Sequence, residues 1–176
     1  ISRLGSYLRF LRSALHKTLR QVAEEAGAFG DPVSVSLLAD AEKGRVVPSA
    51  GKLMTLAKIY RIPPQRFLDL IELDQRGGGE AKEATLDVLE AKAQEAFELG
   101  DYAQAHMYLE RAVTLPSDKA HGILLRNRKA VCLWKMGKLH WARDEFETVL
   151  GVFELEPPLK MQAYGNLSAV FRGMGN

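Results

Sequence analysis

The sequence predicts an all-α protein, because two observations indicate helices and a third argues against strands. Apolar residues recur at intervals of three and four along most of the chain, as they do on the buried face of a helix. Three glycines, Gly100, Gly137 and Gly175, stand 37 and 38 residues apart, a period typical of repeated helical hairpins. No stretch alternates between apolar and polar residues for long enough to predict a strand.

The first helix is predicted from leucines on one helical face, namely Leu4, Leu8, Leu11 and Leu15. Thr18 is a suitable N-cap for a second helix, which ends at Gly27. A loop that contains Pro32 follows. Ser34 then caps a third helix, which ends at Gly44.

The fourth helix begins at Ser49, because Pro48 disfavours helix in the residue before it. Pro63 and Pro64 start the fifth helix, since proline suits the first turn of a helix better than its interior. We expect this helix to pack through Phe67, Leu68 and Ile71.

Residues 74–83 are predicted to form a Gly-rich linker between two domains. Gly77, Gly78 and Gly79 are consecutive, and each glycine inside a helix costs about 1 kcal/mol relative to alanine. The expected organisation is therefore a first domain in residues 1–73 and a second domain in residues 84–176.

The second domain is expected to hold two complete helical hairpins and a truncated third. The two copies align at Ala93 and Ala130, Ala105 and Ala142, Leu109 and Phe146, and Ala112 and Val149. Only the first helix of the third copy is present, with Ser168 and Gly175 in register. Because that copy is incomplete and the chain begins at Ile1 without Met, we expect a fragment of a longer protein.

The net charge of the chain is +2, and it is unevenly distributed. Residues 1–72 contain 11 Lys and Arg against 7 Asp and Glu, whereas the rest contains 13 against 15. A basic first domain favours nucleic acid as its partner. The single cysteine, Cys132, excludes an intrachain disulfide and is typical of a cytoplasmic protein. No apolar run has the length of a membrane span, so no membrane partner is expected.

Residues 4–71 resemble the Cro/repressor type of helix-turn-helix domain, also called the XRE family. The resemblance rests on LRFLR in the first helix, TLRQVAEEAG in the second, SVSLLADAEKG in the third and PSAGKLMTLAKIYRIPPQRFLDL in the last two. It implies a five-helix, lambda-repressor-like domain that binds double-stranded DNA with its third helix in the major groove.

Residues 86–176 resemble tetratricopeptide repeats. The first copy carries the family pattern at Ala93, Gly100, Asp101, Tyr102, Ala105, Leu109 and Ala112, whereas the second has Leu139 at the tyrosine position. Both spacings exceed the usual 34 residues of the family. The combination of the two domains resembles bacterial transcriptional regulators, some of which bind short signalling peptides in the repeat groove.

The helix-turn-helix resemblance places Val35, Ser36 and Asp40 against base edges. None of them offers the paired hydrogen bonds by which Arg reads guanine or Gln reads adenine, so we expect weak base readout supplemented by DNA shape. The expected phosphate contacts lie near helix ends, at Lys17, Thr18, Arg20, Ser34, Lys43, Arg45 and Lys52. For each basic residue the alternative is a solvated surface charge.

The resemblance also assigns a structural partner to Glu42. In the family pattern this position pairs with an arginine of the first helix, here Arg12 or Arg9.

The first helix of each repeat is expected to line a concave groove. Its candidate contacts with a peptide or protein are Gln94, Phe97, Asn127, Trp134 and Asn166. Asparagine amides suit a peptide backbone, and the two aromatic rings suit an apolar side chain. Ordinary helix packing or self-association is the alternative.

No residue pattern indicates catalysis. The four histidines, His16, His106, His121 and His140, lack the spacing of metal ligands. No phosphate-binding glycine loop occurs in the sequence. We therefore expect no enzymatic activity, no metal and no cofactor.

The sequence thus predicts a sequence-specific or semi-specific DNA-binding transcriptional regulator. Its repeats are expected to mediate homodimerisation, binding of a peptide or protein effector, or both. The main alternative is a protein-interaction adaptor whose degenerate helix-turn-helix does not bind DNA, for which Val35, Leu37 and Asp40 are the evidence. A scaffold that binds DNA without sequence preference is a further alternative.

Overall fold

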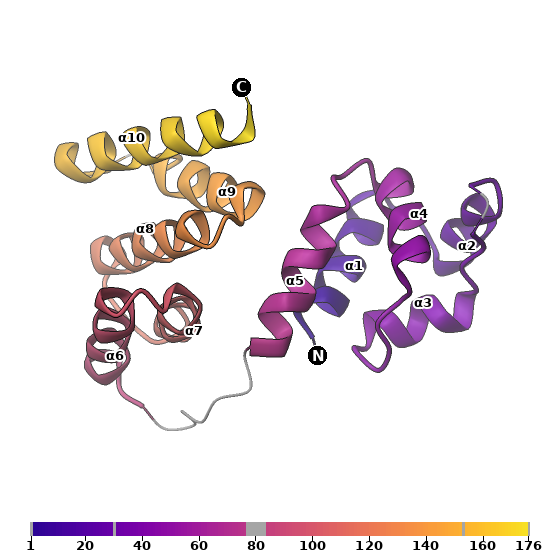
Figure 1. Ribbon diagram of the computed structural model, residues 1–176, viewed down its shortest axis with the longest axis horizontal. Coiled ribbons are helices and arrows are strands. Elements are labelled where there is room, and N and C mark those ends of the chain that lie inside the picture. The colour runs from indigo at the N-terminus through magenta and orange to yellow at the C-terminus, as the bar shows by residue number, and fades with distance from the viewer. Residues whose placement is uncertain (1, 30, 77–83, 153, 176) are drawn as a thin grey trace. The chain divides into compact units, whose positions relative to one another are not determined.

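The computed structural model describes residues 2–29, 31–76, 84–152 and 154–175, and every regular element within them is an α-helix (Figure 1). The all-α prediction is therefore confirmed. The chain divides into two compact units, Ile1–Gly78 and Gly79–Asn176, which are considered separately below.

The described residues of the first unit form five helices, α1 (Arg3–Ala14), α2 (Leu19–Gly27), α3 (Val35–Glu42), α4 (Ala50–Tyr60) and α5 (Gln65–Arg76). α1 packs against α3 and α5, while α2 packs against α3 and α4. Their common core contains the fully buried side chains Leu8, Val22, Leu38, Leu56 and Phe67. This packing buries one face of α2 and of α3 and leaves their other faces open to solvent.

The fifth helix differs from the sequence prediction at two points. It buries Phe67, Leu70 and Leu73, whereas Leu68, which was expected to pack, is 47% exposed because it points about 100° away from Phe67 around the helix. The helix also continues beyond residue 73 to Arg76.

Asp74, in this last turn, connects α5 to the start of α1. Its carboxylate accepts hydrogen bonds from the backbone amides of Arg3 and Leu4, at 3.0 and 3.3 Å. These are first-turn amides of α1, which have no partner within their own helix. The rest of the predicted linker, residues 77–83, lies outside the described residues.

The second unit contains α6 (Leu86–Glu98), α7 (Tyr102–Ala112), α8 (Lys119–Lys135), α9 (Leu139–Leu150) and α10 (Pro157–Met174). Each helix packs against the next along the chain (Figure 1). Gly100 and Gly137 end the first helix of each hairpin with φ of 77° and 74°, a conformation that favours glycine. None of the described helices combines the length and apolar character that crossing a membrane requires.

Candidate functional site

The third helix exposes one edge near its N-terminus. The Ser34 hydroxyl accepts a hydrogen bond from the Leu37 amide at 3.2 Å, which confirms Ser34 as the N-cap. Leu38 is buried beneath the helix, while Val35 is 43% exposed and Ser36 is exposed. Both residues were predicted to meet base edges, and both are accessible from solvent.

The third predicted base contact, Asp40, is paired with a cation. Gly44 has φ of 73° and turns the chain back after α3, so that the Arg45 amide donates to the Asp40 carbonyl at 2.9 Å. The Arg45 guanidinium then donates to the Asp40 carboxylate, with 3.3 Å between Nη1 and Oδ1. The predicted base contact and the predicted phosphate contact thus form one charge pair at the end of α3.

One face of α2 and the start of α3 line a common groove of about 500 Å³. Arg20 contributes from α2, and Ser34 and Val35 contribute from the start of α3, beside Ala23, Glu24, Pro32 and Val33. The Arg20 guanidinium also donates to the Glu24 carboxylate at 3.0 Å. The groove therefore brings together Arg20 and Ser34, two predicted phosphate contacts, with Val35, a predicted base contact.

The N-terminus of α2 is closed by a reciprocal cap. The Thr18 hydroxyl accepts from the Gln21 amide at 3.2 Å, and the Gln21 side chain accepts from the Thr18 amide at 2.8 Å. Thr18 is therefore confirmed as the N-cap. The Thr-x-x-Gln pattern is the sequence feature that indicates Gln21 as its partner. The amides of Leu19 and Arg20, in the first turn, have no acceptor within the helix.

The family comparison agrees with this arrangement. Residues 3–70 match a family described as a helix-turn-helix domain. The first unit therefore contains a helix-turn-helix domain. Neither the curated proteins nor the solved structures that were compared gave a match to the chain.

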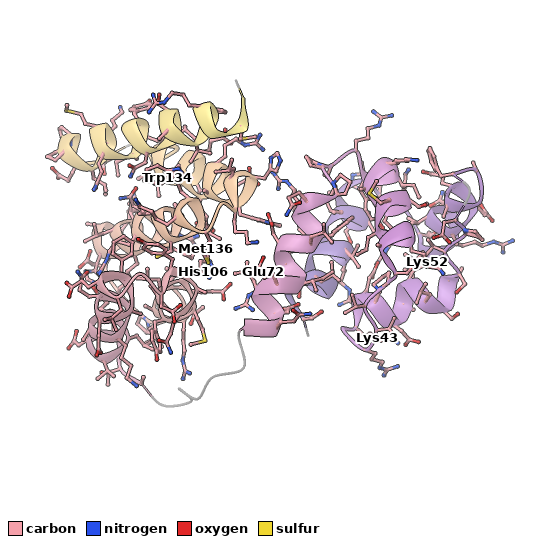
Figure 2. All side chains as sticks on the ribbon, viewed as in Figure 1. Lys43, Lys52, Glu72, His106, Trp134 and Met136 are labelled. Atoms are coloured by element: carbon pink, nitrogen blue, oxygen red, sulfur yellow. The ribbon has the colours of Figure 1, made fainter. Side chains whose placement is uncertain are left out.

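The basic residues of the helix-turn-helix domain differ in how far their charge is compensated. Lys17 forms an ion pair with Glu25, and Lys52 lies 3.9 Å from a carboxylate oxygen of Asp31. Lys43, at the C-cap of α3, is exposed and forms no ion pair within the described part of the chain. Figure 2 shows Lys43 at the end of α3 and Lys52 on α4. Lys43 is therefore the cation of this set that is free to meet an external anion.

Glu42 and Arg12 form the buried ion pair of the helix-turn-helix domain. Two nitrogens of Arg12 donate to the two carboxylate oxygens of Glu42, at 2.6 and 2.8 Å. Arg9 lies farther away, at 3.7 Å, so of the two expected partners Arg12 makes the closer contact. The hydrogen bond with Glu42 raises the pKa of Arg12, and burial raises the pKa of the neighbouring Tyr60. This pair is structural, because it ties α1 to α3.

In the second unit, a chain of polar contacts joins α6 to α8. The Glu90 carboxylate contacts His121 and Arg128, and Arg128 donates to the Gln94 side chain at 2.7 Å. Gln94 in turn donates to Glu98 at 2.7 Å. The amide predicted at Gln94 is thus already engaged in contacts between the two helices.

The other predicted groove residues have different environments. Asn127 is only 2% exposed and donates to Gln162 of α10 at 3.3 Å, so it packs between helices and does not line an open groove. Phe97 is half-buried and contacts the Tyr102 ring edge to face at 5.2 Å. Trp134 is half-buried with the Lys135 ammonium 4.9 Å from its ring centroid, and Asn166 is half-buried on α10. Phe97, Trp134 and Asn166 are therefore each partly accessible to a partner.

Cys132 is fully buried in the apolar core of the second unit, together with Leu89, Leu109 and Leu125. Burial raises the pKa of its thiol from 9.0 to about 12. Among the described residues, no group of three His, Cys, Asp or Glu side chains is placed to hold a metal ion.

Proposed function

We propose that the helix-turn-helix domain binds double-stranded DNA and that the protein is a transcriptional regulator. The observation that carries this proposal is the shared surface of α2 and α3, where Arg20, Ser34 and Val35 line one groove. The N-termini of both helices supply amides that suit phosphate, and the exposed edge of α3 suits the major groove. Lys43, which forms no ion pair with the residues that the structure describes, adds a positive charge at the other end of α3.

The chemistry of α3 supports semi-specific binding. Val35 can contact a thymine methyl group, and the Ser36 hydroxyl can bond to several bases. Asp40 is engaged by Arg45, so it is poorly placed to select cytosine. Affinity then comes mainly from phosphate contacts and from the shape of the DNA.

Titration of the whole chain onto a random duplex at several salt concentrations tests DNA binding. If all five predicted cations of one domain meet phosphate, the slope of log K against log salt is about −4.5, and a fourfold rise in salt weakens binding about 500-fold. If Lys43 alone meets phosphate, the slope is about −0.9. The absence of binding at low salt contradicts the proposal.

The adaptor alternative is favoured by the intramolecular ion pairs. Lys17, Arg20, Arg45 and Lys52 each have an acidic neighbour within the domain. Such pairs are weak when exposed, and phosphate can displace the acid.

Selection from random duplexes addresses the scaffold alternative: an enriched motif supports a regulator, and binding without any enriched motif supports a scaffold.

We further propose that the second unit consists of tetratricopeptide-like repeats. In this proposal the repeats mediate homodimerisation or the binding of a peptide or protein effector. Trp134 and Asn166 are half-buried, and the part of each that stays accessible favours contact with a partner. Homodimerisation would let two α3 helices reach major grooves about one DNA turn apart. Sedimentation equilibrium over a wide concentration range tests it, and a monomer throughout that range contradicts dimerisation.

A further inference from the structure

A second concave surface of the helix-turn-helix domain lies where α1, α2 and α4 end. It is a pocket of about 350 Å³ lined by Leu15, Lys17, Glu25, Phe29, Lys58, Ile59 and Arg61. None of these residues except Lys17 belongs to the predicted DNA-contacting set. This volume is at the small end of the range for ligand pockets and suits a compact molecule better than a folded partner.

The walls of this pocket include apolar side chains that the fold leaves accessible. Leu15 is 43% exposed and Phe29 is 45% exposed, beside Ile59, which is 5% exposed and belongs to the core. Covering an aromatic ring and a leucine removes apolar surface from water, which favours binding. The pocket therefore offers an apolar body a favourable contact.

Cations without an acidic partner stand at the same pocket. Lys17 is compensated by Glu25, but Lys58 and Arg61 form no ion pair with the described residues. The Lys58 ammonium lies 5.9 Å from the centroid of the Phe29 ring, which places positive charge directly beside apolar surface. The arrangement is complementary to a molecule that joins an apolar body to a negative charge.

The backbone at the pocket is held in an unusual conformation. His16, between two lining residues, has φ of 53°, and Arg61 has φ of 54°; they are the two residues other than glycine with positive φ in the described chain. Residues other than glycine rarely adopt this region because it brings Cβ against the following carbonyl, although asparagine, aspartate and histidine do so more often than the others. Arg61 is therefore the more unusual of the two residues. Glycine would relieve this strain at Arg61, yet the sequence places a cation there, on the pocket rim.

We propose that this pocket binds a small apolar anion, in which one carboxylate or sulfonate group meets Lys58 and Arg61 and a compact apolar body covers Leu15 and Phe29. The proposal is independent of DNA binding, because it uses the ends of α1, α2 and α4 and not the exposed edge of α3.

Two fluorescent probes that differ in one anionic group test this site. They are 8-anilinonaphthalene-1-sulfonate and its neutral analogue N-phenyl-1-naphthylamine. Fluorescence titration of the whole chain should show the anionic probe binding more tightly than the neutral one. If the sulfonate probe gives no fluorescence increase, or if it binds no better than the neutral probe, the proposal is overturned.

Substitutions assign the binding to this pocket. Lys58→Met and Arg61→Gly together should weaken the sulfonate probe at least tenfold while leaving the neutral probe within twofold, whereas Phe29→Ala should weaken both. Lys160→Met, at an exposed position of α10, is the matched control and should change neither. Equal binding of the sulfonate probe to the double variant and to the wild type overturns the assignment.

Arg61→Gly also separates binding from folding. Glycine accepts the left-handed conformation, so this variant should melt at the same temperature as the wild type or higher. Loss of probe binding at an unchanged melting temperature supports a ligand contact. Arg61→Lys should retain most of the probe affinity, since it keeps the charge, and its failure to do so contradicts a simple charge contact.

Discussion

Arg45 and Asp40 form a closed pair at the end of the third helix, with backbone and side-chain hydrogen bonds of 2.9 and 3.3 Å. Both side chains are well exposed, so the pair adds little to the stability of the domain. Its consequence lies in binding, because the Asp40 carboxylate competes with DNA phosphate for the same guanidinium. We predict that Asp40→Asn tightens binding to duplex DNA by roughly threefold to tenfold at low salt. Fluorescence anisotropy on several unrelated duplexes measures the change.

A double variant identifies the cause of that gain. If the freed guanidinium is responsible, Asp40→Asn in an Arg45→Ala background should give a much smaller gain. A gain of the same size in both backgrounds would show that Asp40 repels phosphate directly. No gain in either background would place Asp40 away from the duplex.

Lys43 should contribute to affinity without contributing to sequence preference. Changing Lys43 and Arg45 together to Ala should weaken binding to all duplexes alike and make the salt slope less steep by about 1.8. The slope is measured from titrations between low and moderate salt. Lys160→Ala, in the second unit, is the control and should leave the slope unchanged. A loss confined to one DNA sequence would falsify the assignment of these two cations to phosphate.

The Arg12–Glu42 pair should matter for folding and not for DNA contact. Glu42 keeps only 4% of its side chain exposed and Arg12 keeps 19%, so removal of the arginine leaves a buried carboxylate without its main partner. We predict that Arg12→Ala lowers the free energy of unfolding by about 3–5 kcal/mol. Urea denaturation followed by far-UV circular dichroism measures this loss.

The tryptophans provide an internal control for that experiment. Both of them, Trp134 and Trp141, belong to the second unit, so their fluorescence follows that unit alone. Arg12→Ala should shift the dichroism transition of the first unit while the fluorescence transition stays in place. Arg12→Met combined with Glu42→Leu should be less destabilising than Arg12→Ala, because no buried charge is left unpaired. A double variant less stable than the single variant would contradict this explanation.

Local sequence patterns were sufficient to predict where α2, α3 and α4 begin, and the family resemblance predicted the type of the first domain. Thr18 and Ser34 cap α2 and α3 because a hydroxyl before a helix satisfies an amide of the first turn, a contact within a few residues. The Arg12–Glu42 contact followed from the resemblance to a family. The prediction that Leu68 is buried was wrong. The sequence pattern does not distinguish an apolar residue beside the buried face of a helix from one on that face.

Other features depend on three-dimensional contacts that spacing alone does not reveal. Asp40 and Arg45 are five residues apart, a spacing that does not pair side chains along one straight helix, and they meet because Gly44 turns the chain. Asn127 is buried because α10 packs over it. The pocket beside Arg61 lacks a sequence signature, since left-handed residues are usually recognised by glycine.

Burial of Cys132 should make the stability of the second unit fall at alkaline pH. With a pKa of about 12, the folded thiol keeps its proton between pH 9 and 12, whereas the unfolded thiol, with an ordinary pKa of 9.0, loses it. The unfolded state then binds fewer protons, so the free energy of unfolding falls by about 1.4 kcal/mol per pH unit above pH 9. Below pH 9 the thiol is protonated in both states and has no effect on the pH dependence.

Urea denaturation followed by tryptophan fluorescence, at pH 8 and pH 10 under reducing conditions, measures this contribution. Lysines and tyrosines titrate in the same range, so the comparison is with Cys132→Ala, which lacks the thiol but keeps those groups. Between the two pH values the wild type should lose about 1.4 kcal/mol more stability than the alanine variant. Equal losses would mean that the Cys132 thiol ionises in the folded protein, which requires water to reach a side chain that is 0% exposed in the structure.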